Sequence, residues 1–64
     1  MKEYLAKRIE EYLERRIEEL KKEWNTIQKK YFEETDNTMS NYYYSKMCEI
    51  NACIWELRAA LMMI

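Results

Sequence analysis

The apolar residues in the last third of the chain form two neighbouring stripes with the spacing of a helix. One stripe, which we call the core seam, alternates steps of four and three and contains Tyr43, Met47, Ile50, Ile54, Leu57, Leu61 and Ile64. The positions one residue further along, which we call the second seam, are Tyr44, Cys48, Asn51, Trp55, Arg58 and Met62. A helix that packs against one partner needs a single seam, so two adjacent seams indicate a helix with at least two neighbours.

A longer amphipathic pattern occupies the first half of the chain. Its apolar positions are Leu5, Ile9, Leu13, Ile17, Leu20, Trp24, Ile27 and Tyr31. On a helical wheel these positions fall within an arc of about 120°. The spacing therefore predicts a first helix over about residues 2–32, and the two seams predict a second helix over about residues 39–63.

The segment between the two patterns, residues 33–38, favours a turn. It contains Thr, Asp and Asn, which are poor in helix interiors and good at helix N-termini, so Thr35, Asp36 or Thr38 is expected to start the second helix. In one continuous helix the apolar stripe would jump by about 115° between residues 31 and 43, whereas a hairpin turns the second stripe back onto the first. A single long helix is the alternative, since no Gly or Pro forces a stop.

Composition supports an all-α fold in a single domain, residues 1–64. The chain has no Gly, Pro or Val, and strand-rich folds of this size need turn glycines and β-branched runs. Sixty-four residues lie near the lower limit at which a hydrophobic core suffices alone. Because the chain is long enough for only two helices, we expect an antiparallel hairpin that self-associates into a helical bundle, with four helices if it is a dimer.

The residue types needed for catalysis and metal binding are missing from the expected core. There is no His, the commonest general base and metal ligand, and no Glu lies within the seams. Cys48 has no His to activate it and is expected to be a small buried hydrophobe. We therefore expect a protein that is not an enzyme and has no catalytic, cofactor or metal site.

Charge and hydropathy restrict the partners and the location. Eleven basic and twelve acidic residues are finely mixed, without the basic face of a nucleic-acid-binding protein. The mostly apolar residues 50–64 would span only about 22 Å as a helix, which is short of the ~30 Å membrane core. The N-terminal residues lack the apolar stretch of a secretory signal. Cys48 and Cys53 lie about 140° apart on one helix, so reduced thiols and a cytoplasmic location are expected.

The second seam contains two polar residues, Asn51 and Arg58. A polar residue in a seam commonly fixes the register and the subunit number, and two-fold symmetry can bring Asn51 face to face with its own copy. The alternative is a seam at the edge of an interface, where Arg58 reaches water over Trp55. The second seam as a whole is our predicted oligomer interface.

Three consecutive tyrosines stand at the start of the second helix. They cover about 200° of its circumference, so Tyr43 belongs to the core seam, Tyr44 belongs to the second seam and Tyr42 faces elsewhere. Tyrosine is frequent in recognition surfaces, which makes Tyr42 the best candidate for a partner contact. In the alternative account Tyr43 and Tyr44 only cap the end of the bundle. The wholly apolar end, residues 59–64, is expected to be covered within the assembly.

The chain resembles the general class of short helical hairpins that dimerise into four-helix bundles. Small glycine-free chains of this kind are frequent among regulators carried by phages and plasmids. The leading hypothesis is a non-enzymatic protein-interaction module that acts as an inhibitor, adaptor or regulator. One alternative is an oligomer that binds a small anionic or nucleotide-like ligand between subunits; another is a purely structural bundle. Candidate partner or ligand contacts are Tyr42, Tyr44, Lys46, Trp55 and Arg58.

Overall fold

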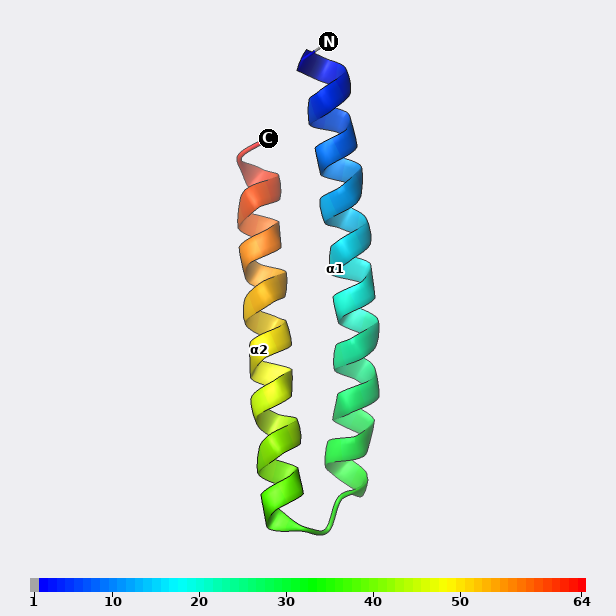
Figure 1. Cartoon of the computed structure of the whole chain (residues 1–64), viewed down its shortest axis with the longest axis vertical. Coiled ribbons are helices and arrows are strands. Elements are labelled where there is room, and N and C mark those ends of the chain that lie inside the picture. Colours follow the sequence, from blue (N-terminus) through cyan, green and yellow to red (C-terminus); the bar gives the residue numbers. More distant parts are fainter. Residues whose placement is uncertain (1) are drawn as a thin grey trace.

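Two helices of unequal length make up the chain in this computed structural model, which describes residues 2–64. Helix α1 spans Lys2–Glu33 and helix α2 spans Asn37–Met62, and the two run antiparallel (Figure 1). The predicted hairpin is confirmed and the single long helix is wrong. The turn is shorter than predicted, because it occupies only residues 34–36 and α2 starts at Asn37.

Side-chain carboxylates build the turn without glycine. The Oε1 atom of Glu34 accepts hydrogen bonds from the backbone N–H groups of Thr35 (3.1 Å) and Asp36 (3.0 Å). Asp36 has extended backbone angles, and its Oδ1 accepts a hydrogen bond of 3.0 Å from the backbone N–H of Thr38. Asp36 is therefore the N-cap among the three predicted candidates, and it satisfies a backbone donor that would otherwise lack a partner.

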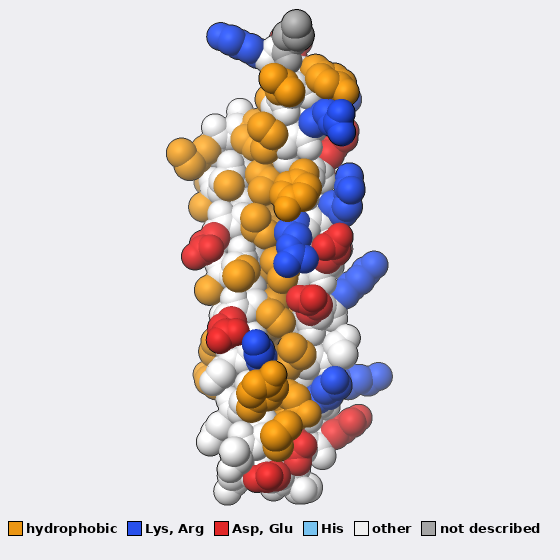
Figure 2. Space-filling view, in the orientation of Figure 1, with side chains coloured by type: hydrophobic (Ala, Val, Ile, Leu, Met, Phe, Trp, Pro, Cys, Tyr) orange, Lys and Arg blue, Asp and Glu red, His pale blue; other side chains and the backbone are white. Residues whose placement is uncertain are grey.

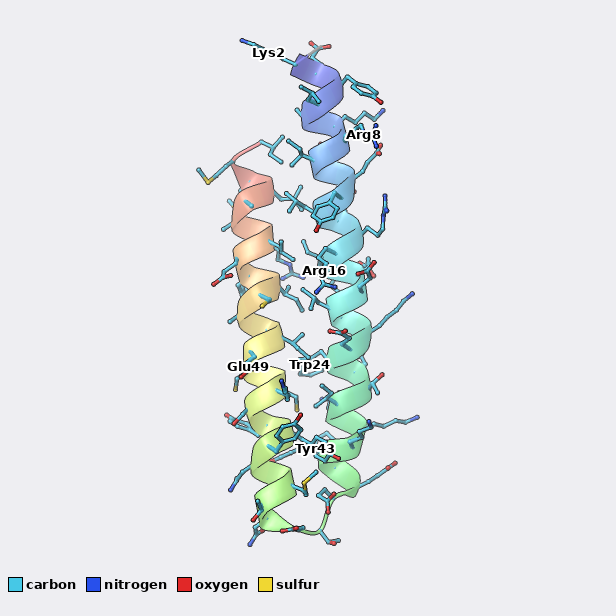
Figure 3. All side chains as sticks on the ribbon, viewed as in Figure 1. Lys2, Arg8, Arg16, Trp24, Tyr43 and Glu49 are labelled. Atoms are coloured by element: carbon cyan, nitrogen blue, oxygen red, sulfur yellow. The ribbon has the colours of Figure 1, made fainter. Side chains whose placement is uncertain are left out.

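The core is a single row of side chains between the helices. Its buried members are Leu13, Ile17, Leu20, Ile50 and Ile54, with Trp24, Ile27, Leu57 and Leu61 partly buried against them. Figure 3 shows Trp24 lying between α1 and α2. The predicted stripes therefore meet along the middle of the hairpin. Leu57 is less buried than its place in the core seam suggested, because it lies about 60° round α2 from the buried Ile54, towards the edge of the contact with α1.

The free ends of the two helices are largely exposed. With 32 residues in α1 and 26 in α2, α1 is longer by about 9 Å at 1.5 Å per residue, and its N-terminal end projects past α2 (Figure 1). Leu5 and Ile9 are more than half exposed, although the predicted stripe placed them in the core. Met62 and Met63 are almost fully exposed. In the single hairpin, residues 62–64 at the apolar C-terminal end are therefore exposed, and their expected cover within an assembly stays a prediction.

The hairpin is elongated and exposes more surface than its mass requires. Its principal extents are 53 × 15 × 11 Å and its radius of gyration is 15.3 Å, against about 11 Å for a compact domain of this length. Its accessible surface is 5532 Å², whereas a compact monomer of 8.0 kDa exposes about 4,450 Å². The excess is about 1,100 Å².

Candidate interaction surfaces

The second seam forms an exposed strip along α2. All of its members are exposed in the hairpin: Tyr44, Cys48, Asn51, Trp55, Arg58 and Met62. The middle of this strip lies about 110° round α2 from the middle of the core seam. Helix α2 therefore packs on α1 with one side and turns a second, largely apolar side to solvent, where Trp55 is 60% exposed.

Arg58 and Trp55 form a stacked pair within this strip. The guanidinium carbon of Arg58 lies 5.4 Å from the centroid of the Trp55 ring. The pair borders a shallow groove of about 300 Å³ between the helices, together with Lys21, Asn25 and Asn51. The contact is the one predicted for Arg58 at an interface edge. Because the guanidinium already lies on an aromatic face, covering the strip desolvates it at less cost than an isolated charge.

A larger groove lies on another side of the hairpin, towards the turn. Its volume is about 620 Å³, and Tyr42 and Lys46 are among its lining residues. The Nζ of Lys46 lies 5.8 Å from the Tyr42 ring centroid and 3.5 Å from Oε2 of Glu49. The groove also contains Lys22 and Glu23, so its walls carry both signs of charge. Figure 2 shows the same mixture on one face of the hairpin, where charged groups flank a line of hydrophobic side chains.

The five predicted partner or ligand contacts do not share one pocket in the single chain. Tyr42 and Lys46 line the larger groove, whereas Trp55 and Arg58 line the smaller one. Tyr42 lies about 160° round α2 from the middle of the second seam. Tyr44 lies on neither groove, and its ring centroid is 6.2 Å from that of Tyr31. A ligand held by all five residues would have to be shared between copies.

Helix α1 carries an exposed apolar surface that was missed in the sequence. It comprises Tyr4, Leu5, Ile9 and Tyr12, and Tyr12 is 60% exposed. Arg8 donates a hydrogen bond of 3.0 Å from Nη1 to the Tyr4 hydroxyl and points away from α2 (Figure 3). The signal that could have found this surface is the unequal length of the two predicted helices, which leaves the start of α1 without a partner.

Between Lys2 and Ile64, no three His, Cys, Asp or Glu side chains come together as metal ligands, and no polar or charged side chain is buried. Neither helix in this range combines the length and apolarity needed to cross a membrane.

Cys48 and Cys53 are free and exposed. Within the single hairpin Cys48 is not buried as expected, because the second seam faces away from α1; its burial in an assembly stays a prediction. Comparisons of the chain with protein-family models, curated proteins and solved structures found no match.

Proposed function

We propose that this chain is a non-enzymatic protein-interaction module whose hairpins pair through the second seam into a four-helix bundle. The observation that carries the proposal is the continuous exposure of that seam along one side of α2, with Trp55 at its centre. Contiguous exposed apolar side chains mark interaction sites, and tryptophan and tyrosine are enriched among the residues that contribute most to binding.

The surface area of the hairpin supports pairing. Its excess of about 1,100 Å² over a compact monomer exceeds the ~800 Å² that each partner buries in a standard interface. Only one row of side chains is buried within the hairpin, and a core of that size gives an isolated chain little stability. Association would bury the seam and stabilise the folded hairpin at the same time.

The direction of the second seam suits a bundle. In a four-helix bundle each helix packs against two neighbours at roughly a right angle, and the two seams of α2 lie about 110° apart. Pairing through the second seam leaves the groove beside Tyr42 and Lys46 open, on the far side of α2. We assign to this groove the contact with a partner protein that the assembled module regulates, as an inhibitor or adaptor.

A small anionic ligand is supported less well than a protein partner. Lys46 is paired with Glu49, and Glu23 lines the same groove, so an anion there would meet carboxylates as well as ammonium groups. A tyrosine with charged side chains around it suits a protein interface, because interfaces are enriched in tyrosine and have a polar rim.

Two matched variants test the pairing. Trp55 and Tyr12 are both 60% exposed, so Trp55→Glu and Tyr12→Glu place a carboxylate at equally accessible aromatic positions on different helices. We expect wild type to sediment as a dimer at micromolar concentration. Trp55→Glu should sediment as a monomer with reduced helicity, because it removes the largest apolar side chain of the seam and makes the interface desolvate a carboxylate. Tyr12→Glu should stay dimeric. A folded wild-type monomer, or equal effects of the two variants, would contradict the proposal.

A further inference from the structure

We propose that two copies pair antiparallel through the second seam, about a two-fold axis that passes beside Asn51. This inference rests on the proposed function and adds the direction of the partner helix to it. Two identical helices can meet in parallel, where each residue faces its own copy, or antiparallel, where residues at equal distances before and after the axis meet. The two arrangements bring different side chains together.

The second seam is complementary to itself in the antiparallel direction. Tyr44 lies seven residues before Asn51 and Arg58 lies seven residues after it. Antiparallel pairing therefore brings Tyr44 of each copy to Arg58 of the other, and a guanidinium over a tyrosine ring is attractive. Cys48 and Trp55 lie three residues before and four after Asn51, so the same pairing sets a small side chain beside a large one.

The parallel arrangement lacks this complementarity. It brings Arg58 to Arg58, where two like charges repel in an apolar contact. It also places the two Trp55 indoles, the largest side chains of the seam, against each other. The two small Cys48 side chains then face each other at a different point along the helices. Charge and side-chain volume therefore both favour the antiparallel direction.

An axis beside Asn51 also covers the exposed end of α2. Helix α2 spans Asn37–Met62, and Asn51 lies near its middle. Pairing about this residue places residues 40–62 of one copy along residues 40–62 of the other. Met62, which is almost fully exposed in the single hairpin, then lies opposite Ser40 at the start of the partner helix. Almost the whole length of α2 takes part in the contact.

Asn51 would set the register of this contact. Its side-chain amide carries both donors and acceptors, so two Asn51 amides that face each other across the axis satisfy one another. Any other register leaves each amide against apolar side chains without a partner. The exposed, polar residue at the centre of the seam thus favours one alignment over its neighbours.

Disulfide trapping tests the direction. In a background of Cys48→Ser and Cys53→Ser, both at exposed positions, single cysteines are introduced as Asn51→Cys, Tyr44→Cys or Arg58→Cys and oxidised with diamide. We expect Asn51→Cys to give a covalent dimer. Tyr44→Cys and Arg58→Cys alone should not link, because each is about 21 Å along the helix from its own copy. Chains with Tyr44→Cys mixed with chains with Arg58→Cys should link.

Glu56→Cys is the matched control, because residue 56 is exposed on α2 about 120° round from the second seam. It should not link alone or in mixtures. Light scattering on each unoxidised variant gives its mass and so tests whether the chains pair at all, separately from the direction in which they pair. Dimers that link through Tyr44→Cys alone and Arg58→Cys alone would overturn the antiparallel direction and leave pairing intact. Chains that stay monomeric would overturn both.

Discussion

Replacing Ile54 by alanine probes the core most directly. Ile54 is 6% exposed and belongs to the buried cluster with Ile17, Leu20 and Ile50. The substitution removes about three methylene-sized groups, whose transfer from water accounts for roughly 2.4 kcal/mol. A cavity adds to this, and buried Ile→Ala changes cost about 2–5 kcal/mol. Because the core is one row that can partly collapse, we expect a loss of about 2.5–3 kcal/mol in the free energy of unfolding.

Such a loss is large for a chain of this size. Stabilities of about 0.05–0.15 kcal/mol per residue give roughly 3–10 kcal/mol for 64 residues. With an unfolding entropy of about 2.1 cal/mol/K per residue, each kcal/mol lowers Tm by roughly 7 °C. We therefore expect Ile54→Ala to lower Tm by roughly 18–21 °C. Far-ultraviolet circular dichroism measures this, with all samples at one protein concentration because association makes Tm depend on it.

Leu57→Ala is the matched control, since it removes the same number of carbon atoms from the same helix. Leu57 is only partly buried, and it lies about 140° round α2 from the second seam, so pairing through that seam does not cover it. We expect about half the loss seen for Ile54→Ala. Equal or larger loss at Leu57 would refute the reasoning, because it would place the buried side of α2 further round the helix.

Substitutions at two further positions have defined outcomes. Asp36→Ala should lower the free energy of unfolding by about 1 kcal/mol, because the Thr38 N–H loses its acceptor. Asp36→Asn should keep most of the stability, because asparagine also caps helices. Urea denaturation measures both variants, and equal losses would argue against a capping role of Asp36. Asn51→Leu should raise Tm and broaden the distribution of assembly sizes in sedimentation velocity, because a register-fixing polar pair is removed. If Asn51→Leu sediments as the same single species as wild type, Asn51 has no role in setting the register.

The fold could be predicted because its determinants are local. The carboxylate of Asp36 accepts a hydrogen bond from a backbone N–H two residues away, so its capping role can be predicted from the neighbouring residues alone. The spacing of Ile17, Leu20, Ile50 and Ile54 fixes which side of each helix is apolar. Helix ends were displaced by one or two residues, as expected where a capping side chain rather than hydrophobic spacing sets the boundary.

Exposure depends on the partner helix and was predicted less well. The pattern of α1 is the same at Ile9 as at Ile17, yet Ile9 is exposed because α2 ends before covering it. Cys48 lies in an apolar seam, but a seam is buried only when a neighbour covers it. Similarly, Tyr42 and Trp55 lie on different sides of α2 and line different grooves. Their residue types alone had suggested that both contact one partner or ligand.

The three-residue turn has a kinetic consequence. A connection this short brings the end of α1 and the start of α2 together with little loss of loop entropy, and contacts then extend pair by pair along the helices. Helical proteins dominated by such local contacts fold in microseconds to milliseconds. If pairing supplies the stability that one row of core side chains lacks, the slow step is the collision of two transiently closed hairpins. The observed folding rate would then rise with chain concentration, and dilution alone would slow it.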